Sequence, residues 1–198
     1  MPPTNPARRR ALTDAAIELV AASGAHGLTH RAVEQAAGLP TGTASNYYRS
    51  REALLVATAE RIVELHLADM EQAADRHETP ADLAGLLTES LLTAATTLRT
   101  RYLAIFELQL EATRRPALAS ALAGLQDAST RFTVGHHQGL GLAVPPERVP
   151  VLIALYGGAL FTLVTAPPEH IGREAVESIV DAMIHGALPQ SNNGRSHH

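Results

Sequence analysis

The chain has 198 residues, of which 45% are hydrophobic and 18% charged, so it holds enough apolar material for the cores of one or two globular domains. It contains no cysteine, which excludes disulfides, thiolate metal ligands and a cysteine nucleophile. Although the net charge is −4, residues 1–50 carry five arginines against three acidic residues, so a part that binds a polyanion is expected near the amino terminus.

The chain opens with a proline-rich stretch, residues 1–7, and a run of three arginines at positions 8–10. Such a run can lie along phosphates or enter the minor groove of DNA, or it can be the solvated start of a helix, and the sequence leaves both open. The apolar pattern that follows predicts a helix to about Ser23, ended by Gly24. No uninterrupted apolar core follows the arginines, so no secretory signal is expected.

Residues 28–52 read as two short helices joined by a sharp turn. Thr29 is a good N-cap for the first of them. Gly38 can take the left-handed conformation of a helix exit, and Pro40 prevents the helix from continuing. The expected apolar stripe of this helix consists of Ala32, Val33 and Ala36.

The second short helix has Thr41 as its expected cap and turns Ala44 and Tyr48 toward the core. Ser50 is expected to cap the helix after it. An outer face that is small, polar or basic suits entry into a groove, and here that face consists of Gly42, Thr43, Asn46 and Arg49. The spacing is that of a helix-turn-helix, although a helical hairpin without DNA binding is the alternative.

Two runs of residues in this region, Thr41-Gly42-Thr43 and Tyr47-Tyr48-Arg49-Ser50-Arg51-Glu52-Ala53-Leu54-Leu55, resemble the TetR family of bacterial transcription regulators. Ser45 stands where that family commonly has an aromatic residue, Tyr48 replaces Phe, and Arg51 replaces Lys. The resemblance implies an all-α fold of about nine helices. Its parts would be a DNA-binding head at 1–50 and a ligand-binding and dimerisation domain at 51–188. Residues 189–198 are polar and low in apolar content, so they are expected to form a disordered tail.

The resemblance also implies a DNA-contacting set. The residues expected at phosphates are Thr29, Arg31, Tyr47, Arg49 and Arg51. Those expected at base edges are Thr43 and Asn46, because an Asn side chain suits adenine. The complete predicted set is Thr29, Arg31, Thr41, Gly42, Thr43, Ser45, Asn46, Tyr47, Arg49 and Arg51, with Gly42 allowing close backbone approach. Tyr48 is assigned to the core of the head.

The remaining helices are predicted from apolar stripes and from breakers between them. Their expected limits are about Arg51 to His77, Thr79-Pro80 to a junction at Arg99-Thr100-Arg101, Tyr102 to Arg114, Pro116 to His137, Glu147 to Thr165, and Arg173 to Leu188. The helix from Tyr102 mixes aromatic and hydrogen-bonding side chains, which suits the wall of a small-molecule pocket, although plain core packing is the alternative. The candidate ligand-binding residues are His66, Met70, Tyr102, Phe106, Gln109, Thr113 and Tyr156.

The helix from about Glu147 is apolar nearly all round, so one side is expected to face the core and another a partner. With the helix from Arg173 it forms the predicted homodimer interface, which the resemblance implies is a four-helix bundle. The apolar run 151–166 is shorter than the roughly 20 residues that a membrane span needs. A cytoplasmic protein without a membrane partner is expected.

These features favour a ligand-responsive transcriptional regulator, expected to be a repressor, that binds palindromic operator DNA as a homodimer and is released by an unknown small molecule. In the alternative, the second domain only dimerises and no effector exists. An enzyme is disfavoured because the sequence contains none of the nucleophile, metal-protease, di-iron or nucleotide-binding motifs. No metal or cofactor is expected. His197 and His198 are left out of these inferences.

Overall fold

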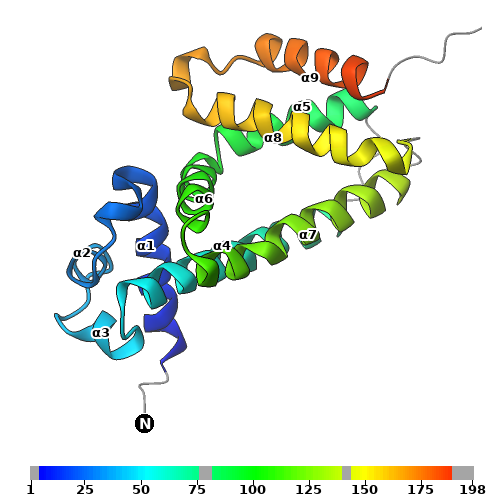
Figure 1. The fold of residues 1–198 in the computed structure, drawn as a ribbon. Helices are drawn as coiled ribbons and strands as arrows, with labels where there is room; N and C mark the ends of the chain where they lie inside the picture. Colours follow the sequence, from blue (N-terminus) through cyan, green and yellow to red (C-terminus); the bar gives the residue numbers. More distant parts are fainter. Residues whose placement is uncertain (1–4, 76–81, 140–143, 189–198) are drawn as a thin grey trace, which may run out of the picture. The chain divides into compact units, whose positions relative to one another are not determined.

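The computed structural model describes residues 5–75, 82–139 and 144–188 (Figure 1). Within these ranges it contains nine α-helices and no strand, which confirms the all-α prediction. The helices are α1 (Pro6–Gly27), α2 (His30–Ala36), α3 (Thr43–Tyr47), α4 (Arg51–Asp75), α5 (Leu83–Ala95), α6 (Arg99–Ala112), α7 (Pro116–Gly139), α8 (Val149–Thr165) and α9 (Arg173–Ala187). Single 3-10 turns, Pro146–Arg148 and Pro168–His170, precede α8 and α9.

Packing divides the described chain into two units. The first consists of 5–75 and 98–129, with α1 to α4, α6 and the first part of α7, and the second contains α5, α8, α9 and the rest of α7. The predicted domain limit at residue 50 was placed at the end of the helix-turn-helix motif, whereas the first packing unit extends beyond it. The limit stays a prediction. The predicted tail lies outside the described residues.

The first unit is built around α1, which packs against α2, α4 and α6. The stripe that α1 buries is the one expected from its sequence, and Leu12, Ala16 and Val20 are fully buried. One hydrophobic cluster joins these residues to the two short helices and to α4 and α6. The helix-turn-helix therefore rests on a core shared with α4 and α6, and a displacement of either helix acts on it through that core.

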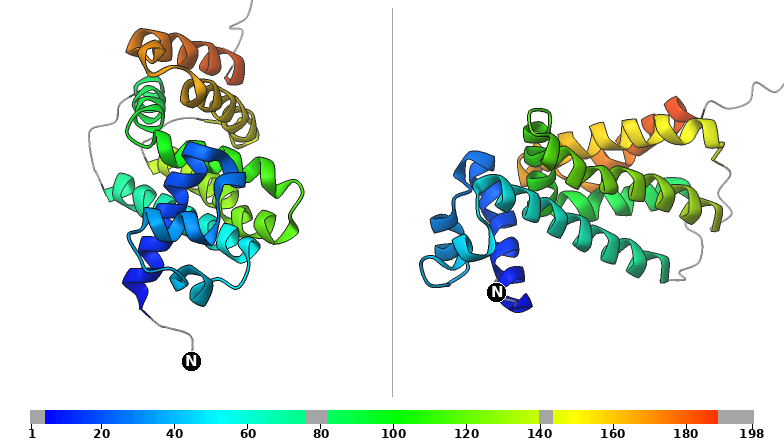
Figure 2. Two further views of the ribbon diagram at one scale, coloured as in Figure 1. Left: turned by 90° about the vertical axis from the view of Figure 1, so that its left-hand side faces the viewer. Right: turned by 60° about the horizontal axis from the view of Figure 1, so that its bottom comes forward.

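The second unit is formed by α5, α8 and α9, which pack against one another (Figures 1 and 2). Its buried apolar side chains include Leu87, Leu91, Leu152, Leu160, Val176 and Val180. On α8 the large side chains of Val151, Leu155 and Phe161 are 41%, 39% and 48% exposed, respectively. This unit alone therefore leaves one side of α8 uncovered.

One helical stretch of the described chain, Pro146–Thr165, is long and apolar enough to cross a membrane by length and composition. The prediction considered only the run 151–166, whereas the helical stretch also includes the turn Pro146–Arg148 and the start of α8. Core helices of soluble proteins meet the same criterion, so the observation is weak evidence for a membrane segment.

Two predicted helix limits were wrong. The segment Arg99-Thr100-Arg101 is the first turn of α6 and not a junction, because arginine is a good helix former and the amide of Tyr102 already bonds to the carbonyl of Leu98 at 3.1 Å. In α1, Gly24 does interrupt the helix, with φ of 68°, but a further turn continues to Gly27. The predicted start at Thr79-Pro80 lies outside the described residues, and Asp82 caps α5.

Candidate nucleic-acid interface

The corner between α2 and α3 is built as its sequence predicts. The hydroxyl of Thr29 accepts a hydrogen bond from the amide of Ala32 at 3.1 Å and so caps α2. At the other end Gly38 has φ of 64°, the left-handed conformation that a side chain would strain. These two positions fix where α2 begins and ends, and hence the direction in which the chain enters α3.

The start of α3 differs from the prediction. Its N-cap is Gly42, with φ of 89°, and not Thr41, and this cap supplies no side-chain hydrogen bond. An acceptor comes from α2 instead, because Oε1 of Glu34 accepts from the amide of Ala44 at 2.7 Å. Glu34 is only 4% exposed, so a buried carboxylate of α2 caps the start of α3.

Glu34 was not predicted from the sequence, and Ala36, predicted in the apolar stripe of α2, is exposed. The error has a physical reason. Helix α2 buries Val33 and Glu34. Glu34 is buried because its carboxylate accepts the hydrogen bond of the Ala44 amide, which has no side-chain cap at the start of α3. The signal in the sequence is the glycine before α3, which cannot cap the helix with a side chain.

The inward residues of α3 match the prediction, and the outward face matches it at Asn46 and Arg49. Ala44 is fully buried and Tyr48 is 5% exposed, so both point into the head. Burial raises the pKa of the Tyr48 hydroxyl, and the guanidinium of Arg9 beside it opposes that rise. The residues left exposed are Thr41, Ser45, Asn46 and Arg49, while Gly42, Thr43 and Tyr47 are half-buried.

Polar contacts fasten this face to its surroundings. Nε2 of His30, at the start of α2, lies 2.7 Å from the carbonyl oxygen of Tyr48. The hydroxyl of Tyr47 donates to the carbonyl of Asn5 at 3.3 Å, which brings the start of α1 beside the end of α3. The exposed run of arginines at 8–10 begins three residues after Asn5. The run therefore starts within one helical turn of this contact with α3.

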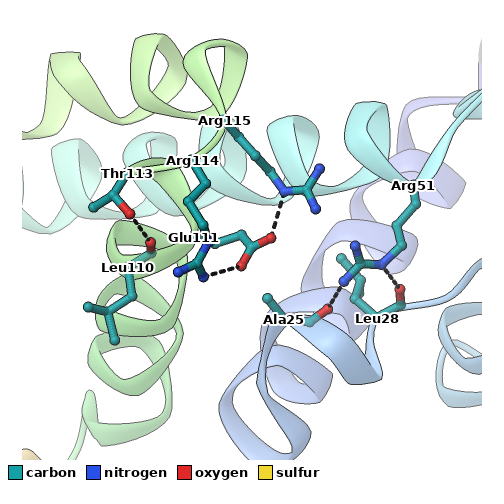
Figure 3. Close-up of polar contacts among 8 residues, drawn as sticks. All are labelled: Ala25, Leu28, Arg51, Leu110, Glu111, Thr113, Arg114 and Arg115. Atoms are coloured by element: carbon teal, nitrogen blue, oxygen red, sulfur yellow. Dashed lines mark hydrogen bonds and ion pairs between the residues drawn. The ribbon is translucent and has the colours of Figure 1, made fainter.

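Arg51, predicted at a phosphate, has partners inside the protein (Figure 3). Its Nε donates to the carbonyl of Leu28 at 3.0 Å, and its Nη2 donates to the carbonyl of Ala25. Of the other predicted phosphate residues, Thr29, Arg31 and Arg49 are exposed and Tyr47 is half-buried. Arg51 is the one of the three predicted phosphate arginines that is not exposed.

The predicted ligand-binding residues fall in both units. In the first unit the rings of His66 and Tyr102 meet edge to face, with centroids 6.1 Å apart. Burial lowers the pKa of His66, and the charge of Arg101 lowers it further. Met70 and Phe106 are half-buried, whereas Gln109 and Thr113 are exposed.

Tyr156, the remaining candidate, belongs to the second unit. Its hydroxyl oxygen lies 2.7 Å from Oγ of Ser90, and burial raises its pKa. Among the described residues no group of three or more His, Cys, Asp or Glu side chains could hold a metal ion. Two of the candidate ligand residues, His66 and Tyr102, are thus in ring contact with each other.

Comparison with known proteins gives two family matches. Residues 12–58 match the bacterial regulatory proteins of the tetR family, and residues 78–186 match the tetracyclin repressor-like C-terminal domain. The chain belongs to the TetR family. By family and by fold, it is therefore a DNA-binding transcription regulator with a helix-turn-helix.

Solved structures of TetR-family proteins resemble the chain over nearly its whole length. The multidrug binding protein EbrR complexed with ethidium is 27% identical, with a TM-score of 0.66 over 91% of this chain and 99% of that one. A TetR-family member from Streptomyces coelicolor A3, SCO1917, is 29% identical, with a TM-score of 0.68 over 90% and 98%. GusR of Salmonella enterica, at 21% identity and a TM-score of 0.69 over 93% and 97%, shows the fold alone. No curated protein sequence matches significantly.

Proposed function

We propose that this TetR-family protein is a transcriptional repressor that binds palindromic operator DNA as a homodimer and leaves it when a small molecule binds. The observation that carries the proposal is the outward face of α3, which is small and polar at Gly42, Thr43 and Asn46 and is held by contacts from α2 and α1. A rigid, bare face of this kind can approach the base edges of a major groove closely. A cytoplasmic location follows from that DNA target.

The proposed contacts divide by chemistry. Thr43 and Asn46 reach base edges, and an Asn amide can bond to both N6 and N7 of adenine. Thr29, Arg31 and Arg49 lie at phosphates, where they fix the register of the protein on the duplex without reading sequence. Tyr47 joins them by exchanging its 3.3 Å hydrogen bond to the carbonyl of Asn5 for one to a phosphate. Thr41, Gly42 and Ser45 border the same surface. Arg51 is considered separately below.

The proposed dimer uses α8 and α9. The exposed side chains of Val151, Leu155 and Phe161 are large and apolar, and burying them against a second copy would remove them from water. The neighbouring surface of α9 is small, with exposed Ala182 and Gly186, so a partner helix can approach closely. A two-fold dimer would place its α3 helices in successive major grooves about 34–36 Å apart, hence the palindrome.

The proposed effector site uses the aromatic side chains of α4 and α6, above all His66 and Tyr102. EbrR, a relative of similar length, is a multidrug binding protein with structures bound to ethidium and to proflavin. Flat aromatic cations stack on rings and are attracted to ring faces, so ethidium and proflavin are suitable probes for this chain. A ligand that binds better to a state unable to bind DNA releases the operator by shifting the population.

The DNA-binding proposal is tested by titrating the protein against the DNA upstream of its own gene and its divergent neighbour, with random DNA as competitor, at two salt concentrations. Specific binding of a palindromic fragment that weakens steeply with salt is the expected result. Affinity equal to that for random DNA on every fragment would contradict the proposal.

The effector proposal is tested on the protein–operator complex. Because both compounds also intercalate into DNA, their saturable binding is followed by fluorescence on the protein without DNA. Release of the operator at the same concentrations is expected for the wild type and not for a protein in which His66 and Tyr102 are both changed to Ala, which controls for direct binding of the compounds to DNA. A protein that binds its operator but neither compound would favour the alternative, in which the second domain only dimerises.

A further inference from the structure

Arg51 is the first residue of α4, and its side chain crosses to the junction between α1 and α2 (Figure 3). Its guanidinium donates through Nε to the carbonyl of Leu28 and through Nη2 to the carbonyl of Ala25. The residue is half-buried, and both Ala25 and Leu28 are at least 98% buried. The two acceptors are backbone atoms at the end of α1 and just before α2.

Both carbonyls lie where helical hydrogen bonding runs out. Ala25 is in the last turn of α1, beyond the interruption at Gly24, and its carbonyl accepts from the amide of Leu28, the C-cap residue, at 3.2 Å. A cation at that end also meets the negative end of the helix dipole. Arg51 therefore adds a second, charged donor to the carbonyl of Ala25 and donates a charge-assisted hydrogen bond to that of Leu28.

The geometry needs the forked guanidinium. Nε and Nη2 are held in one plane and reach two acceptors at once, whereas a lysine ammonium is a single point charge on a flexible stem. A second contact joins the same two parts of the chain, because Nε2 of His30, the first residue of α2, lies 2.7 Å from the carbonyl oxygen of Tyr48, the C-cap of α3. The segment that leads into α2 is therefore held to the segment that follows α3 by Arg51 and by His30.

We propose that Arg51 is a positioning residue for DNA binding, which holds the helix-turn-helix in register with α4, and not a phosphate contact. The proposal rests on the proposed DNA-binding function. Arg51 gives two of its five N–H donors to Leu28 and Ala25, and swinging the side chain toward DNA would break both hydrogen bonds. The position of α2 and α3 relative to α4 depends on these two hydrogen bonds of Arg51.

The test compares four proteins on the operator fragment: the wild type, Arg51→Ala, Arg51→Lys and, as a matched control, Arg49→Ala. Arg49 is an exposed arginine two residues away and one of the proposed phosphate contacts. Affinity is measured across a range of salt concentrations, at a temperature where circular dichroism shows all four proteins folded. Affinity for random DNA is measured in parallel, and thermal melting reports the stability of each protein.

A positioning role predicts that both Arg51 variants bind the operator roughly tenfold or more weakly. Without the two charge-assisted hydrogen bonds, α2 and α3 are no longer held in place relative to α4. The slope of log affinity against log salt stays at the wild-type value, because no phosphate contact has been removed. Arg49→Ala is expected to reduce that slope by about 0.9. Binding to random DNA by the Arg51 variants stays near the wild-type level.

Two outcomes would overturn the inference. If Arg51→Ala reduces the salt slope by about one and Arg51→Lys binds like the wild type, Arg51 is a phosphate contact. If both variants melt earlier but bind the operator like the wild type, Arg51 is merely structural. Failure of the DNA-binding proposal itself is distinguishable, since the wild type would then show no specific binding.

Discussion

At the scale of single residues, Glu34 is the side chain on which the start of the recognition helix depends, through its 2.7 Å bond to the amide of Ala44. Glu34→Ala leaves that buried donor unpaired and is expected to lower the free energy of unfolding by about 1–3 kcal/mol. Glu34→Gln keeps a side-chain oxygen in place and should lose less. Urea unfolding of the three proteins measures this, and equal losses for both variants would contradict the capping role.

Glu111 makes a prediction about pH. Its carboxylate accepts from Arg115 at 2.6 Å and from Arg114 at 3.0 Å, and these hydrogen bonds lower its pKa from 4.5 to about 2. Because the folded-state pKa lies below the unfolded one, the stabilisation is complete above the unfolded pKa and is lost as the pH falls toward 2. Glu111→Gln should therefore reduce stability at pH 7 and flatten its decline between about pH 5 and 2.

The matched control for Glu111 is Glu71→Gln, which changes an exposed glutamate of α4. That variant should keep both the wild-type stability at neutral pH and the steep acid limb. Unfolding free energies measured at several pH values between 2 and 7 compare the proteins. An acid limb in Glu111→Gln as steep as that of the wild type would show that the ion pairs with Arg114 and Arg115 do not stabilise the fold.

At the scale of elements, the interruption of α1 at Gly24 is where α6 meets the head. Gly24 has φ of 68°, and a Cβ built there would lie 3.2 Å from Oε2 of Glu107 on α6. Gly24→Ala is expected to lower the free energy of unfolding by about 1 kcal/mol or more, from backbone strain alone. The control Gly124→Ala lies in the interior of α7, where an added Cβ would meet no atom within 4 Å outside its own helix backbone, and it should instead stabilise. Equal effects in thermal melts would contradict this account.

The sequence predicted the elements whose signals are local. The cap at Thr29, the corner at Gly38 and the inward positions of Ala44 and Tyr48 each follow from residues within one turn, and the structure confirms them. Contacts between distant parts of the chain were not predicted. Examples are Glu34 with Ala44, His30 with Tyr48 and Arg51 with Ala25, because these pairings depend on how the helices pack. For the same reason, the roles proposed for the DNA-contacting residues stay predictions.

At the scale of the whole molecule, the uncovered side of α8 predicts the state of assembly. Leu155 is 39% exposed there, and Leu155→Arg would place a charge in the proposed dimer interface. The variant is expected to sediment as a monomer and to lose most of its operator affinity, since one head alone reads one half-site. The control Leu110→Arg changes a 61% exposed leucine of α6 and should stay dimeric. A dimeric Leu155→Arg protein would rule out this interface.

The central claim, that α3 reads base edges in two symmetric half-sites, is tested most directly by the change in base preference of Asn46→Ala. Operators carrying each base pair at every position of one half-site, and then of the other, are titrated with the wild type and the variant. We predict that the variant loses about 1–3 kcal/mol of discrimination at one A·T pair, at the symmetric position of each half-site, while binding to random DNA is unchanged. An unchanged preference at every position would contradict the account, because Asn46 would then not be reading the DNA.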